Sequence, residues 1–305
     1  MHVLQLIFPL FVIIFVGYVL RRTGFAPPGF VDELNRLVYF IGLPALLFSE
    51  TRKVDLGQLA GSAPAVAFPI VVAATALVAL GATLLIPHRQ RGQVVQAGFR
   101  ANLAYLGLPI VSTTLGDETL ATIAIIIAVG ITMNAVAGIL VLSLLSPSRE
   151  NLHPLKRLKS ILTNPLLIAI VLGLLFAASG WSLPNLLARP IELLSTMSLP
   201  LILLVLGLSL SFSELGRNFA GAALAAVIKL AVMPAIAWLV MRFVFAGPDA
   251  VVHTAVLMAA MPTAVVSQSF AKAFEADASI SAASVSLSTL LAVLTVPLLV
   301  LILGV

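Results

Sequence analysis

The chain contains no cysteine and few charged residues. The absence of cysteine excludes disulfides, iron–sulfur clusters and thiolate metal sites. Charged residues make up 10% of the 305 positions and hydrophobic residues 61%, a composition too apolar for a water-soluble domain. We expect no metal and no cofactor, because the four histidines are far apart and lack ligand spacing: His2, His88, His153 and His253.

The sequence also lacks the patterns of two functional classes. An intramembrane enzyme needs H-E-x-x-H, paired aspartates or G-x-G-D within a span, so we expect no catalytic residue. The net charge of +5 is scattered between apolar runs without interleaved aromatics, which argues against a nucleic-acid partner. The start MHVLQLIF has no basic residues before its apolar run, and Arg21 and Arg22 follow that run. This order predicts a retained first helix instead of a cleaved signal peptide.

Long apolar runs are what the sequence has in abundance. A bilayer core about 30 Å thick needs roughly 20 apolar residues per helical crossing. Runs such as 123–129 do not alternate between apolar and polar residues, which favours helices over strands. The fold class predicted is therefore an all-α polytopic membrane protein with ten spans, at 4–20, 34–49, 63–86, 94–115, 119–145, 161–179, 190–211, 219–245, 251–271 and 280–303.

Basic residues predict the orientation of these spans. If the connections after the odd-numbered spans share one side, that side holds ten lysines and arginines and the other side four. The positive-inside rule then predicts a protein of the cell membrane with both termini outside the cell and the connection 146–160 on the cytoplasmic side. The ten are Arg21, Arg22, Arg36, Arg89, Arg91, Arg149, Lys156, Arg157, Lys159 and Arg217, and the four are Arg52, Lys53, Arg189 and Arg242.

Helix-breaking residues recur at an offset of 156 positions. This match predicts two five-helix repeats, 1–145 and 161–305, joined by the linker 146–160. An odd number of spans per repeat forces the second copy to enter from the opposite side, so the repeats are expected to be inverted. Inverted repeats are typical of transporters, although scaffolds and channels also use duplicated bundles. Pro9, Gly17, Gly24, Pro28 and Pro44 match Pro165, Gly173, Gly180, Pro184 and Pro200.

The fourth and ninth spans, 94–115 and 251–271, each carry a proline among small residues in mid-span. Pro109 and Pro262 are expected to break these helices and to free the carbonyls of Tyr105 and Met258. Two half-helix amino ends facing a gap suit an anion, whereas a packing kink is the simpler alternative. Polar neighbours of the breaks add candidate ligands: Arg100, Asn102, Thr263, Ser267 and Gln268.

Two further polar residues lie deep inside spans. Lys229 stands about ten residues into 219–245, too deep to reach water easily, so it should face a cavity, a partner or a substrate, or tether backbone carbonyls. Asn134 in 119–145 has the same choice between a substrate and its own bundle. The acidic residues at span ends are expected to be solvated caps: Asp32, Glu33, Asp117, Glu118, Glu275 and Asp277.

These motifs resemble the auxin efflux carrier family over essentially the whole chain. Asn102, Gly107 and Pro109 match its N-x-x-x-x-G-x-P pattern, and Arg100 stands where bacterial members often carry arginine. The resemblance implies a scaffold domain and a transport domain that each draw helices from both repeats, a substrate site where the two broken helices cross, an elevator-like shift and often a homodimer. A second pattern matches at Ala260, Pro262, Val266, Phe270, Ala271, Lys272 and Phe274.

The sequence therefore predicts a secondary carrier of a small organic anion, a mono- or dicarboxylate, in a bile-acid-transporter or NhaA-like architecture. The long hydrophilic loop of plant auxin exporters is missing, and small bacterial members are associated with malonate, malate and related carboxylates. A sodium-coupled organic-anion symporter and a non-transporting sensor or receptor remain alternatives. The expected substrate-binding residues are Arg100, Asn102, Tyr105, Pro109, Asn134, Lys229, Pro262, Thr263, Ser267 and Gln268.

Overall fold

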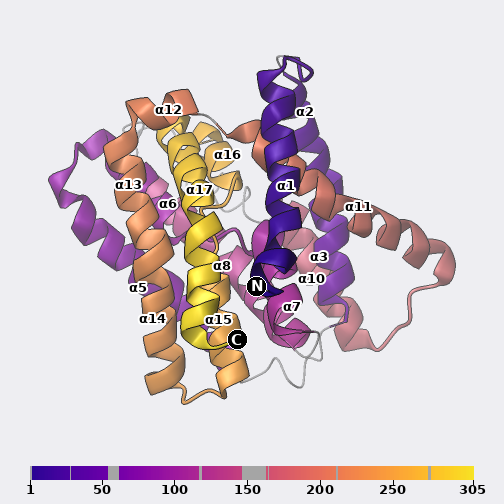
Figure 1. Ribbon diagram of the computed structural model, residues 1–305. Helices are drawn as coiled ribbons and strands as arrows, with labels where there is room; N and C mark the ends of the chain where they lie inside the picture. Colours follow the sequence, from indigo (N-terminus) through magenta and orange to yellow (C-terminus); the bar gives the residue numbers. More distant parts are fainter. Residues whose placement is uncertain are drawn as a thin grey trace.

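The structure, a computed structural model, is almost entirely helical in the residues it describes: 2–27, 29–53, 62–116, 119–145, 163, 165–210, 212–273 and 276–305. The helices follow the apolar runs of the sequence (Figure 1). Their bounds are α1 His2–Arg22, α2 Phe30–Leu37, η1 Val38–Gly42, α3 Leu43–Thr51, α5 Ala63–Ala82, η2 Thr83–Leu85, α6 His88–Phe99, η3 Leu103–Gly107, α7 Leu108–Leu115, α8 Leu120–Leu145, α10 Pro165–Ser179, α11 Asn185–Ser209, α12 Phe212–Arg217, α13 Phe219–Val227, η5 Ile228–Val232, α14 Met233–Leu239, η6 Val240–Val244, α15 Asp249–Ala259, α16 Val266–Ala273 and α17 Ala278–Leu303.

Several helices are long and apolar enough to cross a membrane, as predicted for a multi-pass protein. Five meet both criteria within the described residues: Ala63–Leu85, Thr122–Leu142, Asn185–Ser209, Phe219–Val244 and Ala278–Leu303. The predicted span 4–20 corresponds to α1, 34–49 lies in the continuous helix α2–η1–α3, and the remaining spans correspond to shorter or interrupted helices. The count of ten and the orientation stay predictions. The predicted linker 146–160, with its four basic residues, lies outside the described residues, as do Pro28, Asp117, Glu118, Phe274 and Glu275.

Three helices contain a wide π-turn directly before a proline. The residue before Pro44, Pro109 and Pro234 donates its N–H to the carbonyl five residues back, in η1, η3 and η5 respectively. Proline has no N–H to donate, and its ring clashes with the carbonyl four residues earlier in a regular helix. A turn of five residues relieves both problems, so the chain continues as a helix through each proline.

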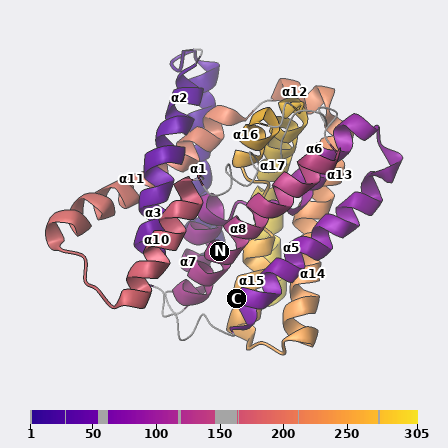
Figure 2. The same cartoon turned by 180° about the vertical axis from the view of Figure 1, so that it is seen from behind.

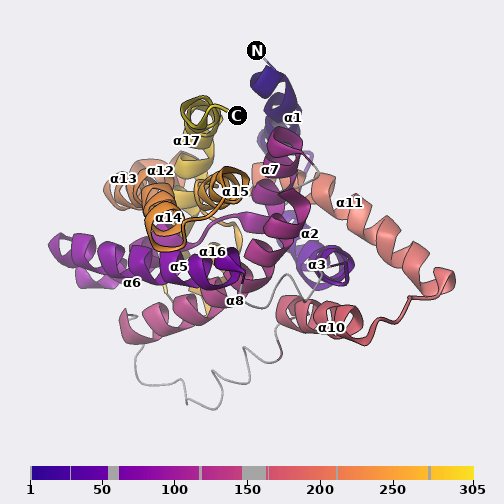
Figure 3. The same cartoon turned by 90° about the horizontal axis from the view of Figure 1, so that it is seen from below.

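The helices pack into two groups, each drawn from both halves of the chain (Figures 1 and 2). The first group contains α1, α2, η1, α3, α10 and α11, with α1 packed on α11 and α10 packed on α3. The second group contains α5, α6, α8 and α12 to α17. Seen from below, α7 and part of α8 lie between them (Figure 3).

Contacts in the first group follow the sequence offset. Gly17 of α1 is so close to Gly207 of α11 that an added Cβ would meet the α11 backbone, and a Cβ at Gly173 of α10 would collide with the hydroxyl of Thr51 in α3. The offset of 156 equates Gly17 with Gly173 and Thr51 with Gly207. The two contacts are therefore reciprocal, which favours the predicted repeat, while its inversion stays a prediction.

Two residues that the offset equates also contact each other. A Cβ at Gly42 would lie 2.8 Å from Oγ of Ser198, so η1 crosses α11 at positions 42 and 198. The matched glycines Gly24 and Gly180 both have left-handed backbone angles, with φ of 74° and 65°, where a helix has just ended. Equivalent positions of the two halves thus perform equivalent structural tasks.

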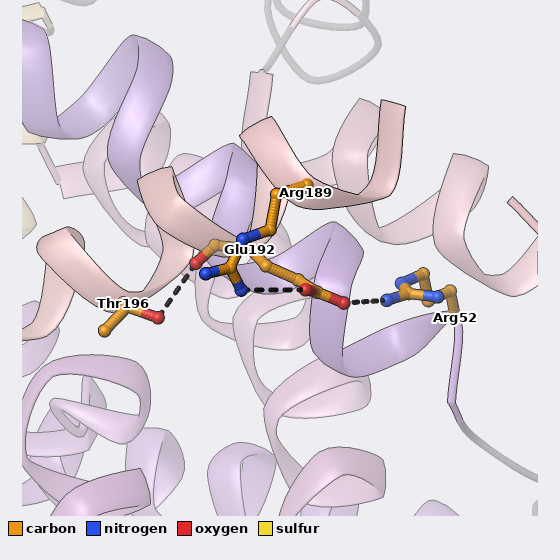
Figure 4. A network of polar contacts seen from close by, with 4 residues as sticks. All are labelled: Arg52, Arg189, Glu192 and Thr196. Atoms are coloured by element: carbon orange, nitrogen blue, oxygen red, sulfur yellow. Dashed lines mark hydrogen bonds and ion pairs between the residues drawn. The ribbon is translucent and has the colours of Figure 1, made fainter. Parts of the chain in front are cut away.

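An ion pair joins the end of α3 to α11 (Figure 4). Nη2 of Arg52 lies 3.3 Å from Glu192, and Nη1 of Arg189 lies 4.0 Å from the same carboxylate. The hydroxyl of Thr196 donates to the Glu192 carbonyl at 2.9 Å. Both partners of the shorter pair are partly exposed, so we expect it to orient α3 on α11 and to add little stability.

Gly207→Ala is expected to destabilise the protein by about 1–3 kcal/mol, because the new methyl group would meet the carbonyl of Ile14 in α1. Gly216→Ala is the matched control, since a Cβ there has no neighbour within 4 Å. Thermal unfolding in detergent should give a lower midpoint for Gly207→Ala and an unchanged or higher one for Gly216→Ala. Equal midpoints would mean that α1 and α11 are not in close backbone contact.

Candidate functional site

Two interrupted helices cross at the centre of the molecule. The chain leaves helical geometry at 100–102, between α6 and η3, and again at 260–265, between α15 and α16. The two gaps lie side by side and form an isolated antiparallel bridge between Ala101 and Thr263. The predicted breaks in the fourth and ninth spans are therefore present, and they meet.

The gaps satisfy each other's backbone. The N–H of Asn102 donates to the carbonyl of Pro262 at 2.9 Å, and the N–H of Ala264 donates to the carbonyl of Arg100 at 3.0 Å. Non-helical backbone within an apolar slab needs such partners, because no water is available to supply them. The crossing is thus an inter-helix structure that neither segment could form alone.

The two prolines do not play equal parts. Pro262 lies in its gap, as predicted, whereas the prediction that Pro109 breaks its helix is wrong. Pro109 is the second residue of α7, and the π-turn η3 carries the helix through it, so the break falls at 100–102 instead. The Met258 carbonyl was expected to be free, but it accepts the N–H of Met261 at 3.4 Å.

A cavity of about 60 Å³ adjoins the crossing. It brings together four of the predicted site residues, Arg100, Asn102, Tyr105 and Asn134, which come from the first gap, η3 and α8. The other predicted residues do not line it. Its remaining lining residues are Leu43, Ala101, Leu103, Ala104, Ile131, Ala135, Ala264, Val266 and Phe270.

Arg100 is the charged group of this cavity. Its side chain is buried, with 3% of the residue exposed, and Nη2 donates to the carbonyl of Asn134 at 2.6 Å. The guanidinium carbon lies 3.7 Å from the ring centroid of Phe270, and Nε has no hydrogen-bond partner. Among the described residues no carboxylate pairs with it. A buried cation held by a neutral carbonyl and a ring leaves positive charge uncompensated.

Two side-chain amides in the same cavity also lack partners. Nδ2 of Asn102 and Oδ1 of Asn134 are buried and make no hydrogen bond. A buried polar atom without a partner costs about 1–3 kcal/mol, so its retention points to a ligand or to water. The helix that begins at Leu103 adds N–H groups without intrahelical acceptors and the positive end of its dipole. The cavity is therefore suited to an anion.

Lys229 does not line the cavity, and its side chain binds the end of α15 next to the crossing. Its residue is fully buried, and the ammonium donates to the carbonyl of Ala259 and contacts Sδ of Met233 at 3.1 Å. Ala259 is the last residue of α15, where unpaired carbonyls and the negative end of the helix dipole favour a cation. Of the two predicted roles, this geometry favours a tether to backbone carbonyls over contact with a substrate.

The remaining polar candidates split between structural bonds and a second cavity. The hydroxyl of Thr263 donates to the Ala97 carbonyl at 2.9 Å, and its N–H donates to Oγ of Ser288 at 3.0 Å. Ser267 is buried outside the 60 Å³ cavity. Gln268 lines a larger cavity of about 750 Å³, together with residues from the α1–α2 turn, the end of α11 and the start of α17.

Two residues of the site were not recognised from the sequence as functional. Phe270 stacks on the guanidinium, and its place in the quoted family pattern was the available signal. Gly138 lies one helical turn after Asn134 and leaves room for Arg100, because a Cβ there would collide with Nη2. A glycine four residues after a buried asparagine was a signal that the sequence did contain.

Comparison with known proteins gives a consistent result. The family model described as "Membrane transport protein" matches residues 2–300. An "Uncharacterized transporter" of Methanothermobacter thermautotrophicus is 28% identical over 295 residues, covering 94% of each chain. A "Putative malonate transporter" of Rhizobium meliloti is 26% identical over 309 residues, covering 95% of this chain and 92% of that one.

Lys229→Met is expected to lower the thermal unfolding midpoint, because the Ala259 carbonyl loses its partner at a cost of about 1–3 kcal/mol. Malonate, which the name of the Rhizobium relative suggests as a test compound, serves as the probe of the cavity, and any affinity for it should stay within about twofold of wild type, since Lys229 does not line the cavity. Calorimetry on the same sample measures both quantities. An unchanged midpoint with lost affinity would place the ammonium in the binding site instead.

Proposed function

The chain belongs to the membrane transport protein family, and we propose that it is a secondary carrier that binds a small organic anion in the cavity at the helix crossing. The observation that carries this proposal is Arg100, a buried guanidinium with no carboxylate partner among the described residues. A carboxylate from solution would supply the missing charge and a charge-assisted hydrogen bond.

The neighbours of Arg100 suit a carboxylate substrate. Nδ2 of Asn102 donates to one oxygen, and the amino end of the helix at Leu103 attracts the same charge. The cavity of about 60 Å³ fits only a small molecule. The name of the Rhizobium relative supports a short dicarboxylate such as malonate as the first compound to test.

The two helix groups suggest how the anion moves. We assign α1, α2, α3, α10 and α11 to a scaffold and the helices that carry the crossing to a transport domain that shifts past it. The cavity combines residues of the crossing with Leu43 at the start of α3, so it lies where the groups meet. In this elevator scheme the protein works in the cell membrane, assembled as a homodimer through its scaffolds.

Arg100→Gln and Asn102→Ala are expected to reduce malonate uptake into proteoliposomes by at least about tenfold. Each removes a bond to the anion, and bonds to charged groups contribute about 1.5–3 kcal/mol. Arg36→Gln is the control, because Arg36 lies on the surface of α2, where it pairs with Glu33 at 3.5 Å. Uptake by all three variants at the wild-type rate would refute the site.

Two further arms of this assay separate the alternatives. Uptake is measured with and without an inward sodium gradient, and dependence on that gradient would indicate a sodium-coupled symporter. Saturable malonate binding without uptake would indicate a sensor or receptor. The proposed carrier takes up malonate in both salt conditions.

A further inference from the structure

Two glutamines lie buried in α6 on the same face as Arg100. Gln93 and Gln96 are almost fully buried, with 1% and 0% of each residue exposed. Their spacing from Arg100, seven and four residues, places all three on one side of the helix. Glutamine has four hydrogen-bonding positions and is mostly exposed in proteins, so burying two of them requires hydrogen-bond partners.

Hydrogen bonds fix the direction of the Gln96 amide. Its Nε2 donates to the carbonyl of Ser267 at 3.1 Å and approaches Oε1 of Gln93 at 3.4 Å. Oε1 of Gln93 is itself held by the hydroxyl of Ser281, at 2.6 Å. Because Nε2 is committed to these partners from α16 and α6, Oε1 of Gln96 must point the other way.

That oxygen has no hydrogen-bond partner, and it lies near the guanidinium of Arg100. A Cβ added at Gly138 would lie 3.4 Å from Oε1 of Gln96, and the same Cβ would collide with Nη2 of Arg100. Both side chains therefore converge on the notch that Gly138 leaves in α8. Oε1 of Gln96 is buried and makes no hydrogen bond, which destabilises the fold unless water or another state of the protein supplies a donor.

We infer that Gln96 is a positioning residue for Arg100, offering a second acceptor to which the guanidinium turns when a substrate anion draws it away from the Asn134 carbonyl. This inference rests on the proposed carrier function. Both acceptors are neutral, so Arg100 keeps its full positive charge in either position. Glutamine at 96 thereby sets the preference for an anion, because a carboxylate in its place would neutralise the guanidinium.

Gln96→Glu tests this inference directly, because it replaces the side-chain NH2 group by an oxygen of nearly the same size and adds one negative charge. The carboxylate should pair with Arg100 and compete with the substrate, so the dissociation constant for malonate should rise at least about tenfold. Without malonate, the unfolding midpoint of Gln96→Glu should lie above that of Gln96→Met, because both variants lose the Nε2 bond to the Ser267 carbonyl and only the glutamate gains a charged partner. Gln96→Met, which removes the acceptor, should weaken binding by a smaller factor without any gain in stability.

The control is Gln90→Glu, the same substitution on the same helix, at a residue that lines a surface cavity with Arg89 and Arg217. It should leave the affinity for malonate unchanged. An affinity of Gln96→Glu equal to that of wild type would overturn the inference. So would a general loss of affinity in both variants, since the effect would then not depend on contact with Arg100.

A double-variant cycle separates this inference from the carrier proposal. Gln96→Glu is combined with Arg100→Met, and unfolding midpoints are measured without any anion. The inference requires Gln96→Glu to lower the midpoint more when Arg100 is absent than when it is present; equal effects in both backgrounds would overturn it. If the cycle shows this coupling while wild type binds no carboxylate, the carrier proposal fails and the pairing of Gln96 with Arg100 stands.

Discussion

The centre of the molecule depends on two backbone hydrogen bonds between the gaps at 100–102 and 260–265. In an apolar environment each gap alone would leave several peptide groups without partners, and the helices would close up to satisfy them. Because the gaps satisfy each other, both remain open, and the side chains beside them keep fixed positions. The position of Arg100 follows directly from this arrangement, since its own carbonyl accepts one of the two bonds and its side chain lines the cavity.

Two buried cations flank this crossing, and both are held by neutral groups. Arg100 rests on a carbonyl of α8 and a phenyl ring, and Lys229 rests on the last carbonyl of α15. They differ in access, because the guanidinium lines a cavity and the ammonium does not. A fixed positive charge that caps a helix stabilises the fold, whereas one that faces a cavity lacks compensation until an anion arrives. The same chemistry thus serves structure at one position and, in the proposed carrier, recognition at the other.

The sequence predicted the helical segments well, because each apolar run is long and the bilayer requirement is strict. It also found the interruption at Pro262 and the cavity residues Arg100, Asn102, Tyr105 and Asn134. It misplaced the other interruption at Pro109, because a proline constrains only its own turn and a wider turn can absorb that constraint. The contacts of Gly138 and Gln96 with their neighbours could not be predicted, because the spacing within α8 and α6 was visible but the packing between α6, α8 and α16 that gives it meaning was not.

The π-turns before the three prolines have a further consequence for how each helix presents its side chains. A turn that closes over five residues instead of four contains one extra residue, which rotates everything beyond it by about 100° relative to a regular helix. Across the turn, residues spaced three and four apart therefore no longer lie on one face of the helix. The face that contacts a neighbouring helix before the turn is a different one after it. Each of these helices changes phase midway, so one segment can address two different neighbours.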